Sequence, residues 1–128
     1  MKLILRIAAV YSIVFGLYAM MFPNHYFVDW CNMQAPNYPQ LWQCIGMITA
    51  VFGLGYWIAS YDPLKHWPIV FIGLLAKIFG PIGFLLAIGQ NILPWKFGQI
   101  LFTNDIIWWI PFGYILVQAI YRSRITVL

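Results

Sequence analysis

Long apolar stretches alternate with short polar connections along this chain. The first stretch covers residues 3–22 and ends at Pro23, the second covers 41–61, and the third begins with Pro68 and covers 68–88. Each holds about 20 mostly apolar residues, which is the length that crosses a hydrocarbon core about 30 Å thick. The pattern therefore predicts a transmembrane helix at each of these places.

The fourth apolar stretch is less regular. Its uninterrupted part, residues 106–120, is too short for a full span, so the helix must extend back to about Ile100. We expect it to cover residues 100–121, which draws Asn104 and Asp105 into or beside the lipid zone. The predicted fold class is all-α: one membrane domain, built as an up-down-up-down bundle of four transmembrane helices.

Composition supports a membrane protein. Hydrophobic residues make up 63% of the chain and charged residues only 8%, whereas a soluble domain is about a quarter charged. The basic residues are scattered, so the net charge of +4 does not indicate a nucleic-acid partner. The chain has no Glu, and its only acids are Asp29, Asp62 and Asp105. This scarcity excludes acidic calcium sites and most paired-carboxylate chemistry.

The basic residues in the short connections predict the orientation. With the N-terminus inside, one basic residue, Lys96, lies outside, and five lie inside: Lys2, Arg6, Lys65, Arg122 and Arg124. The apolar run after Arg6 is longer than the core of a secretory signal, and no small-x-small cleavage site follows it. We therefore expect a retained first helix and cytoplasmic N- and C-termini.

Small residues predict where helices pack closely in lipid. They are most regular in the second and third stretches, so we expect these two helices to pack closest. The residues concerned are Gly46, Ala50, Gly53, Gly55, Ala59, Gly73, Gly80 and Gly83.

Lys77 is the most informative polar residue. It lies about 12 Å deep in the third predicted helix, where a charge costs at least about 2.5 kcal/mol and normally faces a partner or a wet cavity. Asp105 is the obvious partner, directly or through water. Pro81 has no amide hydrogen, so it leaves the backbone carbonyl of Lys77 without its helical donor. The sequence leaves open whether this polar locus serves folding or lines a pocket.

The segment 104–112 is the densest motif in the chain. Asp105, Trp108 and Trp109 lie three and four positions apart, on one side of a helix. Together with Asn104, they form a candidate site for a headgroup, a cation or a quinone-like ring. The alternative is a helix start that Asn104 or Asp105 caps, with tryptophans at the membrane interface.

Two further pairs are candidates. Asp62 and His66, four positions apart in the predicted inner connection, suggest either an acid/base pair or a hydrogen bond that closes the hairpin. Because His25 lies on the other side of the membrane, the two histidines cannot share a metal or a haem, and we expect no metal site. Cys31 and Cys44 both lie toward the outer side, so the sequence permits a disulfide between them.

Three short runs resemble small bacterial membrane proteins of four helices related to the DoxX-like group. They are the helix end at Phe22-Pro23, the run Gly53-x-Gly55-Tyr56-x-x-Ala59 ahead of Asp62-Pro63, and Asn104-Asp105-x-x-Trp108-Trp109-x-Pro111-Phe112. The resemblance implies a four-helix protein of the bacterial inner membrane. It also implies an association with thiol or quinone redox systems, which is known for some members of the group.

These observations favour an accessory protein of the inner membrane. We expect it to bind a lipid-like or quinone-like molecule, or a membrane partner, near Lys77, Asp105, Trp108 and Trp109. One alternative is a quinone-linked redox enzyme in which Lys77 or Asp105 handles a proton and a partner or cofactor supplies electrons. A second alternative is a small transporter or channel, which would need a homo-oligomer because four helices hardly enclose a pore.

Overall fold

The computed structural model describes residues 1–127, and its secondary structure is entirely helical over that part of the chain. Four segments are long and apolar enough to cross a membrane: α1 (Lys2–Met21), α2 (Pro39–Ala59), α3 (Trp67–Gly89) and the segment Trp95–Ile125. The first three agree with the predicted helices to within two residues at each end.

The fourth segment is broken into several pieces. It consists of η2 (Trp95–Gly98), α4 (Gln99–Asn104), η3 (Ile106–Trp108) and α5 (Trp109–Val127). The prediction of one helix over residues 100–121 was therefore wrong. The amide of Trp108 donates to the carbonyl of Asp105 (3.1 Å), which tightens the chain into a 3₁₀ turn. Asp105 is the N-cap residue of η3, so a helical segment does begin where the alternative reading of this motif places a helix start, but the Asp105 side chain makes no capping hydrogen bond.

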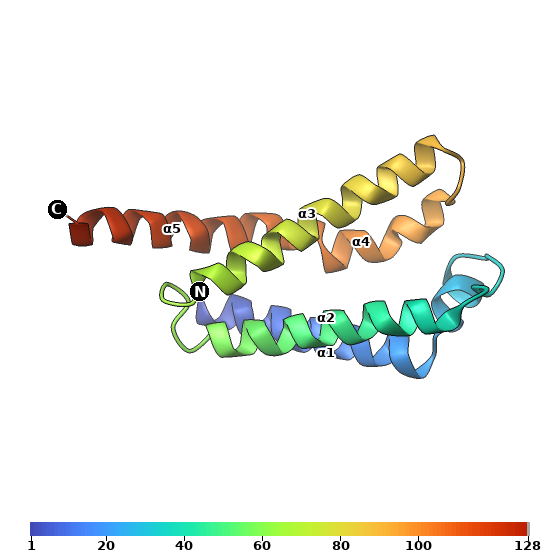
Figure 1. The fold of residues 1–128 in the computed structure, drawn as a ribbon, viewed down its shortest axis with the longest axis horizontal. Coiled ribbons are helices and arrows are strands. Elements are labelled where there is room, and N and C mark those ends of the chain that lie inside the picture. Colours follow the sequence, from blue (N-terminus) through green and yellow to red (C-terminus); the bar gives the residue numbers. More distant parts are fainter. Residues whose placement is uncertain (128) are drawn as a thin grey trace.

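The helices form two hairpins. One pairs α1 with α2, and the other pairs α3 with the broken segment of α4 and α5 (Figure 1). Both termini and the α2–α3 connection lie at one end of the molecule, and the two longer connections lie at the other (Figure 1). The first long connection contains one short π-helix, η1 (Tyr26–Trp30). Toward the end with the long connections, the two hairpins diverge (Figure 1).

The closest helix pair is α1 with α2. A Cβ atom added at Gly46 would lie 2.7 Å from the carbonyl oxygen of Gly16, so the backbones meet where neither residue has a side chain. The prediction that the second and third helices pack closest was wrong. The physical reason is that α1 also has a buried face of small residues, and Gly46 and Gly53 of α2 pack against it. This face comprises Ala8, Ala9, Ser12, Gly16 and Ala19.

Two core clusters join the hairpins. The cluster nearer the termini centres on Tyr56 and Phe112, whose ring centroids lie 5.1 Å apart. The cluster at the other end is aromatic and is built around Phe15, Tyr26 and Trp42, with Phe97 packed against it. Because the hairpins diverge around this second cluster, the space beside it is only partly filled. Two of the hollows described below, the groove and the polar cavity, reach this space, since Phe15 lines both.

Candidate functional site

Lys77 is buried between α3 and the broken segment. Its side chain is only 4% exposed, and its ammonium donates to the backbone carbonyl of Asn104 (2.6 Å). The same nitrogen lies 5.5 Å from the ring centroid of Tyr56 and 5.8 Å from that of Phe112. A carbonyl dipole and two aromatic faces thus stabilise this charge inside an apolar bundle.

Asp105 lies on the other side of Asn104. Its carboxylate accepts a hydrogen bond from the Asn104 side-chain amide (2.8 Å), and its second oxygen packs against Gly80, where an added Cβ would lie 2.9 Å away. Asn104 therefore connects the two charges: its carbonyl binds Lys77, and its amide binds Asp105. The structure brings the three predicted residues together through Asn104 rather than through a direct ion pair.

The two tryptophans of the predicted site bind backbone carbonyls. The Trp109 indole donates to the carbonyl of Lys77 (2.9 Å), the acceptor that Pro81 leaves without a helical donor. The Trp108 indole donates to the carbonyl of Thr103 (3.0 Å), next to the break in the helix. Both indole hydrogens thus bind carbonyls beside interruptions of the helices, where buried backbone groups need a partner.

A cavity of about 240 Å³ lies between α2 and the α3–α4 hairpin, and Lys77, Asn104 and Asp105 line it. Two buried polar atoms among its lining residues have no hydrogen-bond partner: the indole nitrogen of Trp42 and the side-chain oxygen of Asn104. A cavity of this size with several polar groups is suited to ordered water, which would satisfy both atoms.

Asp62 and His66 take the second of their two predicted arrangements, a hydrogen bond that closes the hairpin, whereas Cys31 and Cys44 do not form a disulfide. The Asp62 carboxylate accepts from the backbone amide of Lys65 (3.2 Å), and the backbone amide of His66 donates to the Asp62 carbonyl (3.0 Å). These bonds close the α2–α3 connection without an acid/base pair of side chains. Cys31 and Cys44 are free thiols, so the disulfide that the sequence permits is not formed. Cys31 is buried beside the Lys96 carbonyl, and burial raises the pKa of its thiol.

A groove of about 1030 Å³ lies between α1 and α4. Its floor is one face of α1, where Ile7, Val10 and Val14 follow one another at helical spacing, and Ile100 and Thr103 of α4 line the opposite wall. The walls are almost entirely apolar, and the volume lies at the upper end of the range for small-molecule sites.

The polar groups of the groove lie mainly at its ends. Arg6 lines the end near the termini, where it donates to Ser60 (3.4 Å) and its guanidinium lies 5.5 Å from the Trp57 ring centroid. Tyr18 and His25 line the opposite end. Twelve residues separate Arg6 from Tyr18, which corresponds to about 18 Å along a helix. The groove is thus long and mostly apolar, with Arg6 at one end, Tyr18 and His25 at the other, and the hydrogen bond between Tyr11 and Thr103 between them.

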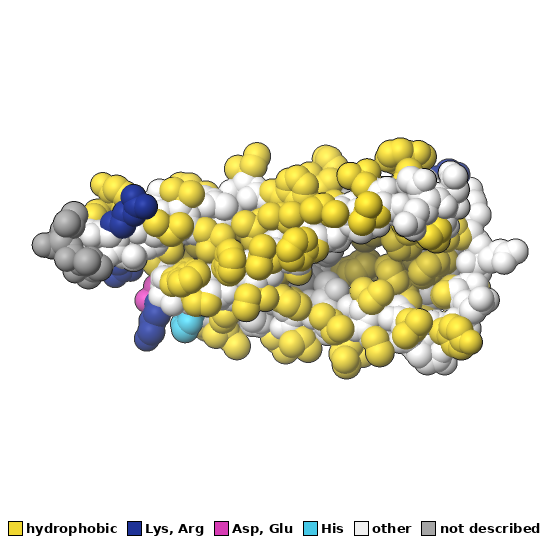
Figure 2. Space-filling model, turned by 45° about the horizontal axis from the view of Figure 1, so that its top comes forward, with side chains coloured by type: hydrophobic (Ala, Val, Ile, Leu, Met, Phe, Trp, Pro, Cys, Tyr) yellow, Lys and Arg dark blue, Asp and Glu magenta, His cyan; other side chains and the backbone are white. Residues whose placement is uncertain are grey.

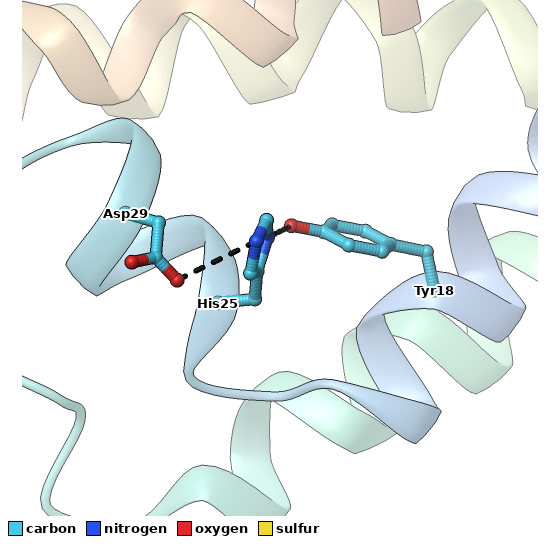
Figure 3. Close-up of polar contacts among 3 residues, drawn as sticks. All are labelled: Tyr18, His25 and Asp29. Atoms are coloured by element: carbon cyan, nitrogen blue, oxygen red, sulfur yellow. Dashed lines mark hydrogen bonds and ion pairs between the residues drawn. The ribbon is translucent and has the colours of Figure 1, made fainter.

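A chain of polar contacts forms the end of the groove near the long connections (Figure 3). The Tyr18 hydroxyl is hydrogen-bonded to Nδ1 of His25, and Nε2 of His25 lies 3.4 Å from the Asp29 carboxylate. His25 and Asp29 also line a second hollow, of about 350 Å³, on the first long connection. The chain of contacts therefore reaches from the groove to the surface of the protein.

Sequence reasoning did not identify this group. The available signals were the spacing of four between His25 and Asp29, and the position of Tyr18 at the end of the stripe formed by Ile7, Val10 and Val14. Neither signal is specific. In particular, an apolar stripe of this kind is also expected on a helix face that is exposed to lipid.

Tyr26 fixes the geometry of this end. Its hydroxyl donates to the carbonyl of Phe97 (2.5 Å) and accepts from the amide of Ile100 (3.1 Å), which holds η1 against the start of α4. Burial raises the pKa of Tyr26 well above its ordinary value, so the hydroxyl keeps its proton and remains a donor.

The groove and the polar cavity are neighbours, because Phe15 and Ile100 line both. Comparison of the chain with protein-family models, with curated proteins and with solved structures found no match. The function proposed below therefore rests on the geometry of the groove and of the groups around it.

Proposed function

We propose that this chain is a multi-pass membrane protein that binds one amphipathic molecule, lipid-like or quinone-like, in the groove between α1 and α4. One observation carries the proposal: a hollow of about 1030 Å³ has mostly apolar walls, and polar side chains, Arg6 at one end and Tyr18 and His25 at the other, lie at both of its ends. A hydrocarbon tail suits the middle of such a groove, and a polar headgroup suits an end.

The buried polar network supports this role by holding the groove wall in place. Lys77 and Trp109 tie α3 to the broken segment through Asn104 and the Lys77 carbonyl. That segment carries Ile100 and Thr103, which line the groove. Thr103 is also hydrogen-bonded to Tyr11 across the groove (2.8 Å). In this proposal the protein is an accessory binding protein, and Lys77 and Asp105 position the site next to the ligand.

The proposed placement is an up-down-up-down bundle in a bacterial inner membrane, with both termini in the cytoplasm. Basic side chains gather at one end of a largely hydrophobic surface (Figure 2), which is the asymmetry that orients membrane proteins. The resemblance to the DoxX-like group supports the same placement.

Native mass spectrometry of gently solubilised protein tests the binding proposal. We expect the wild type to retain one amphipathic molecule. Val14→Trp places an indole over the floor of the groove, so this variant should lose the bound molecule. Val51→Trp is the matched control, because Val51 is exposed to a similar degree on α2 (59% against 61% for Val14) and lines neither cavity.

Two outcomes would contradict the proposal. One is a wild type that retains no small molecule and binds none saturably in a titration. The other is a bound molecule that survives in Val14→Trp as well as in Val51→Trp, which would place the ligand elsewhere. Loss of the molecule in Lys77→Met and Asp105→Asn, but not in Val14→Trp, would instead favour the polar cavity.

A further inference from the structure

The direction of the contact between Tyr18 and His25 depends on which ring nitrogen of His25 carries the hydrogen. An ionised carboxylate only accepts hydrogen bonds, so of the two neutral tautomers the one with its hydrogen on Nε2, which lies 3.4 Å from the Asp29 carboxylate, suits this neighbour. In this tautomer Nδ1 has no hydrogen and acts as an acceptor, and the hydroxyl of Tyr18 is the donor of the bond.

This direction leaves the Tyr18 oxygen as an acceptor. A tyrosine hydroxyl has a single hydrogen, and here His25 takes it. The lone pairs of the oxygen remain available, and Tyr18 lines the groove. A ligand atom that approaches this oxygen thus gains a hydrogen bond only if it brings a hydrogen of its own.

We infer that this end of the groove selects a headgroup that donates a hydrogen bond to Tyr18, namely a hydroxyl of an alcohol, a phenol or a reduced quinol. A carbonyl or an ether at the same position would face the lone pairs of Tyr18 without a hydrogen between them. This inference rests on the proposed function, and it specifies the chemical class of the headgroup at that site.

A matched pair of probes tests the inference. The probes are 4-nonylphenol and 4-nonylanisole, which differ only in that a methyl group replaces the donating hydrogen. Each is titrated into the protein in phosphatidylcholine nanodiscs, and partition into empty nanodiscs is subtracted. A net hydrogen bond corresponds to about a threefold to tenfold difference in Kd in favour of the phenol.

Three variants show which residues cause the preference. In Tyr18→Phe the ratio of the two Kd values should fall to about one. Asp29→Ala should lower the ratio as well, because His25 is then free to carry its hydrogen on Nδ1 and Tyr18 can turn its own toward the ligand. Tyr38→Phe removes a hydroxyl from a tyrosine that is 70% exposed and lies outside the groove, so it should keep the wild-type ratio.

The outcomes separate the inference from the proposed function. Saturable binding of both probes with equal Kd, or a preference that persists in Tyr18→Phe, overturns the inference and leaves the groove as a binding site. Tighter binding of the anisole also overturns it. Saturable binding of neither probe overturns the inference and the proposed function together.

Discussion

Among individual residues, Lys77 makes the most consequential contacts. Its depth in the third helix was predictable from residue counting, and so was the carbonyl that Pro81 leaves free. Its acceptor was not predictable, because depth along a helix does not decide which group a flexible side chain reaches. The structure pairs Lys77 with the Asn104 carbonyl rather than with the Asp105 carboxylate.

We predict that Lys77→Met destabilises the protein strongly. The substitution removes the donor to the Asn104 carbonyl and leaves the buried Asp105 carboxylate without a nearby cation; an unsatisfied buried group costs about 1 to 3 kcal/mol, and a charged one more. The double variant Lys77→Met/Asp105→Asn should recover part of the loss, because no buried charge then remains unpaired. Unfolding in mixed micelles, followed by circular dichroism, measures both. A double variant as unstable as Lys77→Met would contradict this account.

Gly80 provides a second test at the residue scale. A Cβ atom there would lie 2.9 Å from the Asp105 carboxylate, whereas one at Gly83 meets nothing within 4 Å. We expect Gly80→Ala to lower stability by about 1 to 3 kcal/mol, the usual cost of overpacking. Gly83→Ala, one turn along the same helix, should be neutral or slightly stabilising. Equal effects of the two substitutions in the unfolding assay would show that the carboxylate does not pack against Gly80.

Among the elements, the first three spans were predictable and the break in the fourth was not. Span length follows from membrane thickness, so continuous apolar runs locate the helices well. A broken helix keeps the same apolar composition as a straight one, so the pattern over residues 106–120 did not show the break; only the alternative reading of Asn104 or Asp105 as a helix start pointed to the turn at Asp105. Small residues also failed to identify the closest pair, because they show that a helix can approach a neighbour without showing which neighbour.

The contact between Trp109 and α3 predicts coupling between two substitutions. Trp109→Phe should cost about 1 to 3 kcal/mol, because the carbonyl of Lys77 loses the indole donor that replaces the missing amide hydrogen of Pro81. In a Pro81→Ala background the restored backbone amide supplies that carbonyl with a helical hydrogen bond, so the same substitution should cost much less.

A double-mutant cycle measured by unfolding isolates this coupling. Additive effects of Trp109→Phe and Pro81→Ala would mean that the indole acts by packing alone.

At the scale of the whole molecule, the groove arises from how the hairpins are arranged. The face of α1 that carries Ile7, Val10 and Val14 is indistinguishable in sequence from a face exposed to lipid. It becomes the floor of a cavity only because α4 diverges from α1 beyond the core that Tyr56 and Phe112 form. Sequence patterns record the polarity of a face but not the angle between two hairpins, and for this reason the polar residues within a span were found and the groove was not.

The arrangement of the connections also allows the proposed orientation to be tested directly. Gln90 is exposed at the end of the molecule with the long connections, and Ser123 is exposed near the C-terminus, at the opposite end (Figure 1). In a background of Cys31→Ser and Cys44→Ser, we predict that a membrane-impermeant maleimide labels Gln90→Cys in intact spheroplasts. Ser123→Cys should be labelled only after permeabilisation.

The physical reason is that basic residues in short loops resist translocation, and the end that carries Ser123 also carries Lys2, Arg6 and Lys65. The reverse labelling pattern would place the Tyr18, His25 and Asp29 group on the cytoplasmic side. Labelling of both positions without permeabilisation would contradict a placement in which the two ends of the helix bundle lie on opposite faces of a membrane. In the predicted orientation, the polar end of the groove faces outward, so an amphipathic ligand would lie in the outer half of the bilayer with its headgroup at the external surface.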